Sequence, residues 1–284
     1  MKMSEQHIEQ LIALAIAEDI GDGDHTSLAC IPADAVNKAE LRVKEHGILA
    51  GVRVAKLVFA ELMPDAKLEF FMHDGNHIKP GDVVFNIAGN TQKLLQAERL
   101  VLNFMQRMSG IATVTHQYAS KIADLPTKVL DTRKTTPGLR ALEKEAVRIG
   151  GGANHRMGLY DMMMLKDNHI DYAGGIRSAI ERAVAYQITN GLHIPIEVEA
   201  RNIDEVNEIL AIGSVQRIML DNFSIDQTRE AVKIIGKTCE TESSGGITID
   251  TLRNYAECGV DFISVGALTH QIQSLDLSLK AINN

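Results

Sequence analysis

The sequence predicts an α/β protein in two parts, the second of them an α/β barrel. From residue 128 onward, short apolar runs alternate with helical patterns, which is typical of βαβ units and a parallel sheet. The residues before 128 lack this alternation and carry separate helical and strand-like segments. No GxGxxG motif is present, so a barrel is favoured over a doubly wound sheet, although the pattern is compatible with both.

In the first part, apolar spacing indicates both helices and strands. The predicted helices cover 4–19, 52–62 and 91–123, and the predicted strands cover 39–44, 67–72 and 82–88. The last two strands are separated by a turn-rich stretch, HDGNHIKPG. The long third helix is expected to connect this part to the second.

In the second part, six apolar runs are predicted to be strands. They cover 129–132, 162–166, 194–199, 217–221, 237–243 and 261–266, with helices near 138–149, 174–190, 203–212, 225–236 and 248–258. Every run ends in, or is followed by, a charged residue or a glycine-rich turn. Because the active sites of α/β barrels lie at the C-terminal ends of the strands, these residues are candidates for one site.

The composition restricts the possible functions. The chain has 284 residues, a net charge of −8, 4% aromatic residues and no Trp, which argues against stacking platforms for nucleic acid. Cys30, Cys239 and Cys258 form neither a zinc spacing nor a disulfide framework. The N-terminus lacks the layout of a signal peptide, and no apolar run approaches the ~20 residues of a membrane span. We expect a soluble, cytoplasmic protein that binds neither nucleic acid nor a membrane.

Residues 133–166 form a basic segment in this acidic chain. The segment contains seven Lys or Arg and three acids, a net charge of +4. A cleft with low-dielectric walls focuses such a field, which favours a small, multiply charged anion as the ligand. The strongest candidates to bind it are Arg133, Lys134, His155, Arg156 and Lys166, because Arg forks and Lys ammonium groups suit carboxylates and phosphates.

The other basic residues of this segment have a different explanation. Arg140, Lys144 and Arg148 share a helical spacing with Glu143 and Glu145. This pattern is typical of a solvated helix face with surface ion pairs.

Two further groups of residues suit a phosphate-containing substrate. Glu199 and Asp221 end neighbouring strands and could hold Mg²⁺, directly or through water, or balance the basic residues. The turns SSGGI (243–247) and SVGAL (264–268) lead into predicted helices, whose backbone N–H groups can bind phosphate. Their place on the last two strands matches the usual phosphate position in such barrels.

Six motifs together closely resemble quinolinate phosphoribosyltransferase, also called carboxylating nicotinate-nucleotide pyrophosphorylase. They are DTRKTTPGLR, GGGANHRMGLYDMMMLKDNHI, IEVEA, IMLDNF, SSGGI and SVGALTH, in this order and spacing. The segments EDIGDGDHTS and ERLVLNFMQRMSGIAT also match, so the resemblance covers nearly the whole chain.

The resemblance implies an N-terminal α/β sandwich domain at 1–113 and an incomplete barrel of about six parallel strands at 114–284, the fold of type II phosphoribosyltransferases. A C-terminal helix could pack back on the first domain. The family transfers a phosphoribosyl group from 5-phosphoribosyl 1-pyrophosphate (PRPP) to quinolinate with decarboxylation, as part of NAD biosynthesis. It implies a homodimer, in which Arg99 reaches the site of the neighbouring subunit.

The resemblance also assigns roles to individual positions. Arg99, Arg133, His155, Arg156 and Lys166 match the quinolinate-binding positions. Lys134 matches a residue that contacts both substrates, and Glu199 and Asp221 match carboxylates near the ribose hydroxyls and Mg²⁺. The phosphate-binding turns match Ser244, Gly245, Gly246, Ser264, Gly266 and His270. Gln271 departs from the family, which commonly has Ser after TH, so one phosphate-side contact differs.

Two other functions compete with this interpretation. A nicotinate phosphoribosyltransferase, or the molybdenum-associated protein of the same fold, would use similar anion chemistry, but KDNHI and recognition of two carboxylates favour quinolinate. A non-catalytic anion-binding or carrier module would explain neither the Glu199 and Asp221 pair nor the phosphate turns.

Overall fold

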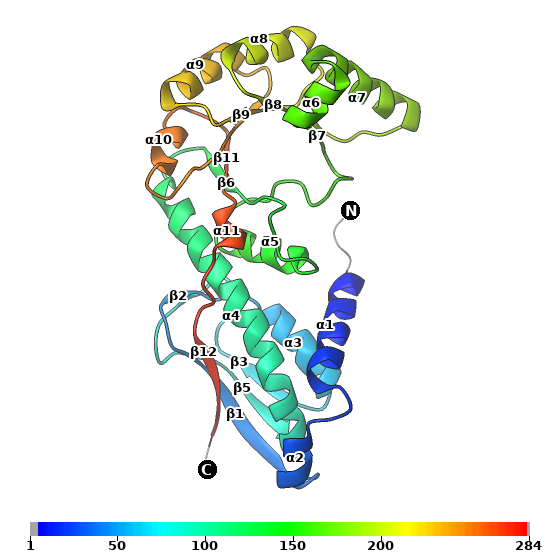
Figure 1. The fold of residues 1–284 in the computed structure, drawn as a ribbon. Coiled ribbons are helices and arrows are strands. Elements are labelled where there is room, and N and C mark those ends of the chain that lie inside the picture. Colours follow the sequence, from blue (N-terminus) through cyan, green and yellow to red (C-terminus); the bar gives the residue numbers. More distant parts are fainter. Residues whose placement is uncertain (1–4, 283–284) are drawn as a thin grey trace. The chain divides into compact units, whose positions relative to one another are not determined.

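The computed structural model describes residues 5–282, which form two compact units. The sandwich unit contains residues 5–116, 136–151 and 269–282, and the barrel unit contains 117–135 and 152–268. A single boundary near residue 113 is predicted from the sequence, whereas the sandwich unit is assembled from three separate stretches of chain (Figure 1). Residue 4, the first of the predicted N-terminal helix, lies outside the described residues.

The sandwich unit is built on a four-stranded antiparallel sheet in the order β12-β1-β5-β3. Its strands are β1 (Val36–Val43), β3 (Lys67–Phe70), β5 (Val83–Asn90) and β12 (Leu277–Ala281). A short ladder pairs β2 (Gly47–Ile48) with β4 (His77–Ile78). The helices are α1 (Glu5–Ile20), α2 (His25–Cys30), α3 (Val52–Leu62), α5 (Arg140–Ile149) and α4 (Thr91–Lys121), whose last residues belong to the barrel unit.

Alternating apolar residues build the core of this unit. Leu41 of β1 and Phe85 and Ile87 of β5 are almost completely buried. The Phe59 ring of α3 meets the Phe85 ring edge-on, with centroids 5.7 Å apart, a favourable geometry for aromatic pairs. Helix α3 therefore contacts the sheet directly.

The predicted C-terminal helix is wrong, because residues 277–281 form strand β12. This strand pairs antiparallel with β1 along its whole length. Leu277 and Leu279 are buried while Ser278 between them is only partly so, and Lys280 is exposed. The segment LSLKA alternates with period two, which suits a half-buried strand and not a helix.

Helix α5 also differs from the prediction of a solvated face. Glu143 and Lys144 are each only 1% exposed. Glu143 accepts from Arg107 of α4 at 2.6 Å, and Glu145 accepts from Arg53 of α3 at 2.6 Å. The helix belongs to the sandwich unit and not to the ring of helices around the barrel. Tertiary packing against α4 thus buries charges that helical spacing alone predicts to be exposed.

The barrel unit contains a six-stranded parallel sheet in the order β6-β11-β10-β9-β8-β7. Its strands are β6 (Lys128–Leu130), β7 (Met163–Leu165), β8 (Ile196–Ala200), β9 (Arg217–Asp221), β10 (Glu240–Ser244) and β11 (Phe262–Ser264). Strands β6 and β7 are the edges and are not paired with each other in the described part of the chain. The predicted incomplete barrel of six parallel strands is confirmed.

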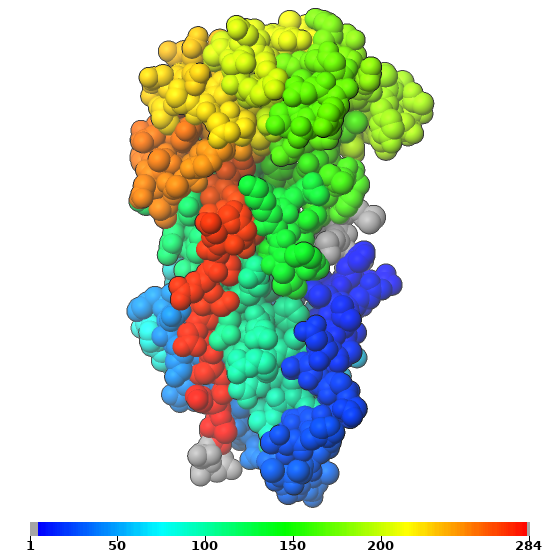
Figure 2. Space-filling model, in the orientation of Figure 1, coloured from blue at the N-terminus to red at the C-terminus, as the bar shows by residue number. Residues whose placement is uncertain are grey.

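Helices connect the strands of the barrel unit. They are α6 (Asp167–Ala173), α7 (Ile176–Asn190), α8 (Ile203–Ile212), α9 (Ile225–Ile235) and α10 (Leu252–Ala256). Helix α11 (Ala267–His270) follows the last barrel strand, and its residues Thr269 and His270 belong to the sandwich unit. Helices α7, α8 and α9 lie along one side of the barrel sheet (Figure 1), and the atoms of this part of the chain form the green to yellow surface in Figure 2. Helix α9 begins at a capping box made by Ser224 and Gln227, which satisfies two backbone N–H groups at its start.

Within residues 5–282, none of the helices combines the length and the apolar character that crossing a bilayer requires.

Candidate active site

The carboxyl edge of the barrel sheet carries the residues that the sequence singles out. Asp221 and Ser244, the last residues of β9 and β10, are register partners, and Glu199 of β8 is paired with Met219 of β9. Ser264 ends β11, and Lys166 follows β7 directly as the N-terminal cap of α6. Since parallel strands end on the same edge of a sheet, these side chains lie along one edge.

Two arginines provide positive charge near this edge. The Arg156 guanidinium is half-buried, and its Nη1 donates to the Met162 carbonyl at 3.2 Å. Burial lowers the pKa of Arg156, and the neighbouring positive charge of Arg133 lowers it further, against the opposing influence of Glu197 and Asp161. No carboxylate of the described residues forms an ion pair with Arg156 within 4.0 Å. An anion bound between the two arginines would relieve this repulsion.

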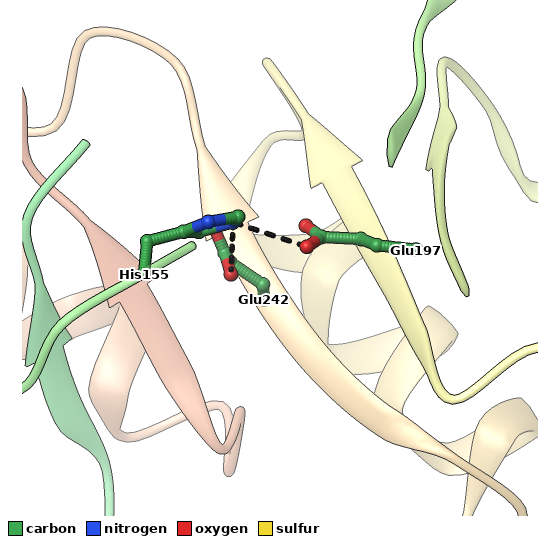
Figure 3. A group of neighbouring side chains, drawn as sticks. All are labelled: His155, Glu197 and Glu242. Atoms are coloured by element: carbon green, nitrogen blue, oxygen red, sulfur yellow. Dashed lines mark ion pairs between the residues drawn. The ribbon is translucent and has the colours of Figure 1, made fainter. Parts of the chain in front are cut away.

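His155 lies beside a buried acidic pair, Glu197 and Glu242 (Figure 3). The Arg156 backbone N–H donates to His155 Nδ1 at 2.6 Å. A nitrogen that accepts a hydrogen bond carries no proton, so the hydrogen of this imidazole is on Nε2. His155 Nε2 lies 3.0 Å from Glu197 Oε2 and 3.5 Å from Glu242 Oε2. Both ring nitrogens of His155 therefore face protein groups.

The loop that contains His155 is tied to the end of β6 by Asp131. This carboxylate is completely buried and accepts from the His155 backbone N–H at 2.9 Å and from Asn154 Nδ2 at 2.5 Å. Hydrogen bonds to a carboxylate are about twice as strong as neutral ones. They hold the loop, and with it Arg156, against the sheet.

Glu197 and Glu242 project from β8 and β10 into the interior of the barrel unit, and both side chains are 0% exposed. Burial raises the pKa of each carboxyl to about 7; the charge of Glu197 raises that of Glu242 further. Arg217 at the start of β9 opposes both shifts, and its Nη1 donates to Glu242 Oε2 at 2.9 Å. Arg217 thus offsets part of the negative charge of the cluster, and the raised pKa values favour protonation of the remainder.

The same three side chains, His155, Glu197 and Glu242, have the donor types of a metal site. Arg217 already occupies the Glu242 oxygen that faces the imidazole. Arg156 and Lys166 add positive charge close to Glu197. A divalent cation here would be repelled by three permanent positive charges, so the cluster has a structural role.

Glu199 and Asp221 form a second acidic pair, at the carboxyl edge. Burial raises the pKa of Glu199, and the negative charge of Asp221 raises it further, while Lys166 lowers it. Among the described residues, no Arg or Lys forms an ion pair with either carboxylate. Two carboxylates that repel each other without such a partner suit Mg²⁺, which prefers a few carboxylates together with phosphate oxygens.

Two glycines follow Ser244, the last residue of β10. Gly245 and Gly246 have φ of +99° and +58°, which L side chains rarely adopt. The turn can therefore present backbone N–H groups to a phosphate without an intervening side chain.

Two sequence profiles match nearly the whole chain. The profile of the quinolinate phosphoribosyl transferase N-terminal domain matches residues 24–109, and that of the C-terminal domain matches residues 111–280. The chain belongs to the quinolinate phosphoribosyltransferase family. The resemblance read from the sequence motifs is confirmed.

Individual members of the quinolinate phosphoribosyltransferase family are similar to this chain over most of their length. Quinolinate phosphoribosyltransferase (decarboxylating) 2b, mitochondrial, of Nicotiana tabacum is 45% identical over 96% of this chain and 82% of that protein. A probable nicotinate-nucleotide pyrophosphorylase (carboxylating) of Bacillus subtilis is 41% identical over 98% and 94%. The crystal structure of NadC from Streptococcus pyogenes superposes with a TM-score of 0.93, at 38% identity and full coverage of both chains.

Two residues that match family positions lie in the other unit. Arg99 is exposed on α4, and His270 is the last residue of α11; both belong to the sandwich unit. No ion pair of Arg99 occurs among residues 5–282.

Sequence reasoning missed the residues that support the site. They are charged side chains inside apolar strands or at their ends: Asp131, Glu197, Arg217 and Glu242. One signal was available, because Glu197 stands two residues before Glu199 and so points to the same face of β8.

Proposed function

We propose that this chain transfers the phosphoribosyl group of PRPP to quinolinate and releases carbon dioxide, which gives nicotinate mononucleotide and pyrophosphate. The observation that carries the proposal is the half-buried Arg156, which faces the charge of Arg133 and has no carboxylate partner among the described residues. Quinolinate has two adjacent carboxylates, the kind of anion that two arginine forks and a lysine would bind.

Quinolinate is bound by Arg133, Arg156 and Lys166 in this proposal. The guanidinium forks orient the ring so that its nitrogen faces the ribose C1. His155, expected among the quinolinate-binding residues, acts chiefly through Arg156, because its Nδ1 accepts from the Arg156 backbone and its Nε2 faces Glu197. The Arg156 main chain is thereby held in one position.

PRPP is bound at the ends of β8 to β11. Glu199 and Asp221 contact the ribose hydroxyls and would hold Mg²⁺, directly or through water. When bound, this ion would supply positive charge for the departing pyrophosphate. Lys134 also supports this leaving group. The phosphates lie on backbone N–H groups and side chains of the two turns, namely Ser244, Gly245, Gly246, Ser264, Gly266 and His270.

The reaction proceeds in two parts. The C1–O bond to pyrophosphate breaks through an oxocarbenium-like state, and the quinolinate nitrogen forms the new bond to C1. The nitrogen is then cationic, so loss of carbon dioxide leaves its electron pair on the adjacent carbon beside a positive charge. A proton from water completes nicotinate mononucleotide. The protein mainly binds and orients, and little general acid–base work is required.

Arg99 completes the quinolinate site from a partner subunit in this proposal, and the protein is at least a homodimer. Its exposure on α4 without an ion pair among residues 5–282 supports this role. We also propose that the protein acts in a reducing compartment such as the cytoplasm, since Cys30, Cys239 and Cys258 are free thiols.

The test is an assay of purified protein with quinolinate, PRPP and Mg²⁺ that follows carbon dioxide and nicotinate mononucleotide. A parallel reaction contains nicotinate in place of quinolinate. Both products from quinolinate alone would support the proposal. Product from nicotinate alone would assign a nicotinate phosphoribosyltransferase, and folded protein that yields neither product would support an anion-binding module.

A further inference from the structure

The turn that joins β9 to α9 contains an uncommon backbone conformation. Asn222 has φ +56°, in the left-handed region that residues other than glycine seldom adopt. Among the described non-glycine residues, only Ser214 shares this feature, with φ +61°. Asn tolerates the region better than most residues, yet such a conformation persists only where surrounding contacts maintain it.

Three contacts of Asn222 join the ends of two strands. Its backbone N–H donates to the Ser244 carbonyl at 2.9 Å, and its Nδ2 donates to Asp221 Oδ2 at 2.6 Å. Its Oδ1 lies against Gly245, where an added Cβ would be only 2.2 Å from that oxygen. Asn222 thus contacts the carboxylate that ends β9 and the glycine turn that follows β10.

The rest of the turn is anchored on its other side. Phe223 is 2% exposed, and its carbonyl accepts from the Tyr255 hydroxyl at 3.0 Å. Ser224 then begins α9 with its capping box to Gln227. The turn is fixed at both ends, so the Asn222 carboxamide is held in place and does not move with a flexible loop.

We propose that Asn222 is a positioning residue for PRPP, which orients the Asp221 carboxylate and sets its separation from the Ser244–Gly246 turn. The inference rests on the proposed function of this edge. Because Nδ2 engages Oδ2, the carboxylate is oriented with Oδ1 available to the ribose hydroxyls or to Mg²⁺. The left-handed backbone brings the Asn222 N–H to the Ser244 carbonyl. This hydrogen bond fixes the position of Asp221, at the ribose end of the site, relative to the Ser244–Gly246 turn at the phosphate end.

Asn222→Gly tests the side chain alone, because it removes the carboxamide and keeps the left-handed backbone. Glycine adopts the left-handed region without strain, so the variant should fold with an unchanged or slightly higher Tm. Loss of a hydrogen bond to a carboxylate should lower kcat/KM for PRPP by about tenfold, with the quinolinate KM unchanged. Asn222→Asp keeps the size of the side chain but replaces the donor by a negative charge beside the Asp221 carboxylate. The loss in kcat/KM for PRPP should therefore be larger than for Asn222→Gly.

Ser214→Gly is the matched control. It removes the side chain at the other positive-φ residue, in the loop before β9, at the opposite end of the same strand. Its kinetics should equal those of the unaltered protein.

A binding measurement gives a readout independent of turnover. PRPP with Mg²⁺ is titrated calorimetrically into protein saturated with phthalate, which has two adjacent carboxylates but no ring nitrogen to react. Asn222→Gly should raise the Kd for PRPP by about tenfold and leave the Kd for phthalate unchanged. Ser214→Gly should change neither value.

The outcomes are distinguishable. If the unaltered protein makes no product from quinolinate, the proposed function fails and this inference fails with it. If the unaltered protein is active and Asn222→Gly binds PRPP as tightly, only the positioning role is overturned. Equal weakening of PRPP and phthalate would indicate general loosening of the site and would also overturn it.

Discussion

Two acidic pairs lie in the barrel sheet, one in its interior and one at its carboxyl edge, and they share strand β8. Glu197 meets Glu242 inside the unit, where His155 faces both carboxylates and Arg217 forms an ion pair with Glu242. Glu199, two residues further along β8, meets Asp221 at the strand ends, where the charge of Lys166 is close and no Arg or Lys of the described residues forms an ion pair.

The difference shows that position along one strand decides whether a carboxylate has a structural role or is available to bind a ligand. A charge inside the core must be neutralised by the protein, because its desolvation is not compensated otherwise. At the strand ends Asp221 is partly exposed, and the charges there can be left for a ligand. The interior pair therefore holds His155, and through it the Arg156 main chain, in place, and the edge pair remains available to Mg²⁺ and ribose.

The largest expected effect is on stability, from Arg217→Ala. This change leaves the Glu197 and Glu242 cluster without its permanent cation, and breaking a buried ion pair costs about 3–5 kcal/mol. Urea unfolding would measure the loss. Arg229→Ala removes an exposed pair with Asp226 and should cost less than about 1 kcal/mol. Equal effects of the two changes would contradict the structural role of the interior pair.

The second effect is a pH dependence of stability. The pKa of Glu242 is raised from 4.5 to about 7 in the folded protein, so its contribution is fully present below pH 4.5 and is lost as the pH rises to about 7. Glu242→Gln resembles the protonated form at all pH values. The variant should therefore gain stability relative to the unaltered protein across this window, by about 3 kcal/mol at most. Unfolding experiments would measure the difference in the free energy of unfolding between the two proteins. A difference that stays constant between pH 4.5 and 7.5 would contradict the raised pKa of Glu242.

The third effect is catalytic, from Glu199→Gln at the edge. Removing one carboxylate from the Mg²⁺ site should lower kcat/KM for PRPP by about a hundredfold and raise the Mg²⁺ concentration that gives half-maximal rate. The free energy of unfolding should change by less than about 1 kcal/mol. An unchanged Mg²⁺ requirement would show that the edge pair does not hold the metal.

The smallest effect is expected for Arg133→Ala, which removes one of several cations from the quinolinate site. The quinolinate KM should rise and kcat should fall, with a combined loss in kcat/KM of about tenfold. The change should also reduce the electrostatic repulsion on the Arg156 guanidinium, because a like charge nearby is removed. Steady-state kinetics with quinolinate varied would measure the loss, and unchanged kinetics would exclude Arg133 from binding.

The local sequence pattern was sufficient to predict much of the fold and several residues at the carboxyl edge of the barrel sheet. The alternation of apolar runs with helical spacing predicted the six parallel strands, and strand ends identified Lys166, Glu199 and Asp221. The prediction failed where a sequence pattern is compatible with two different structures. The C-terminal helix expected from the family resemblance is instead strand β12, whose period-two alternation suits pairing with β1. Glu143 and Lys144 of α5 have the spacing of a solvated face but are buried in the sandwich unit.

The sequence by itself determined which chemical groups the strands deliver and, through its motifs, the family to which the chain belongs. Tertiary structure decided which of those groups are neutralised. Glu197 and Glu242 are 45 residues apart and meet only because β8 and β10 flank β9 in the sheet order. The tautomer of His155 and the left-handed turn at Asn222 likewise depend on partners from other segments. Such contacts arise between distant residues, and no local pattern of side chains encodes them.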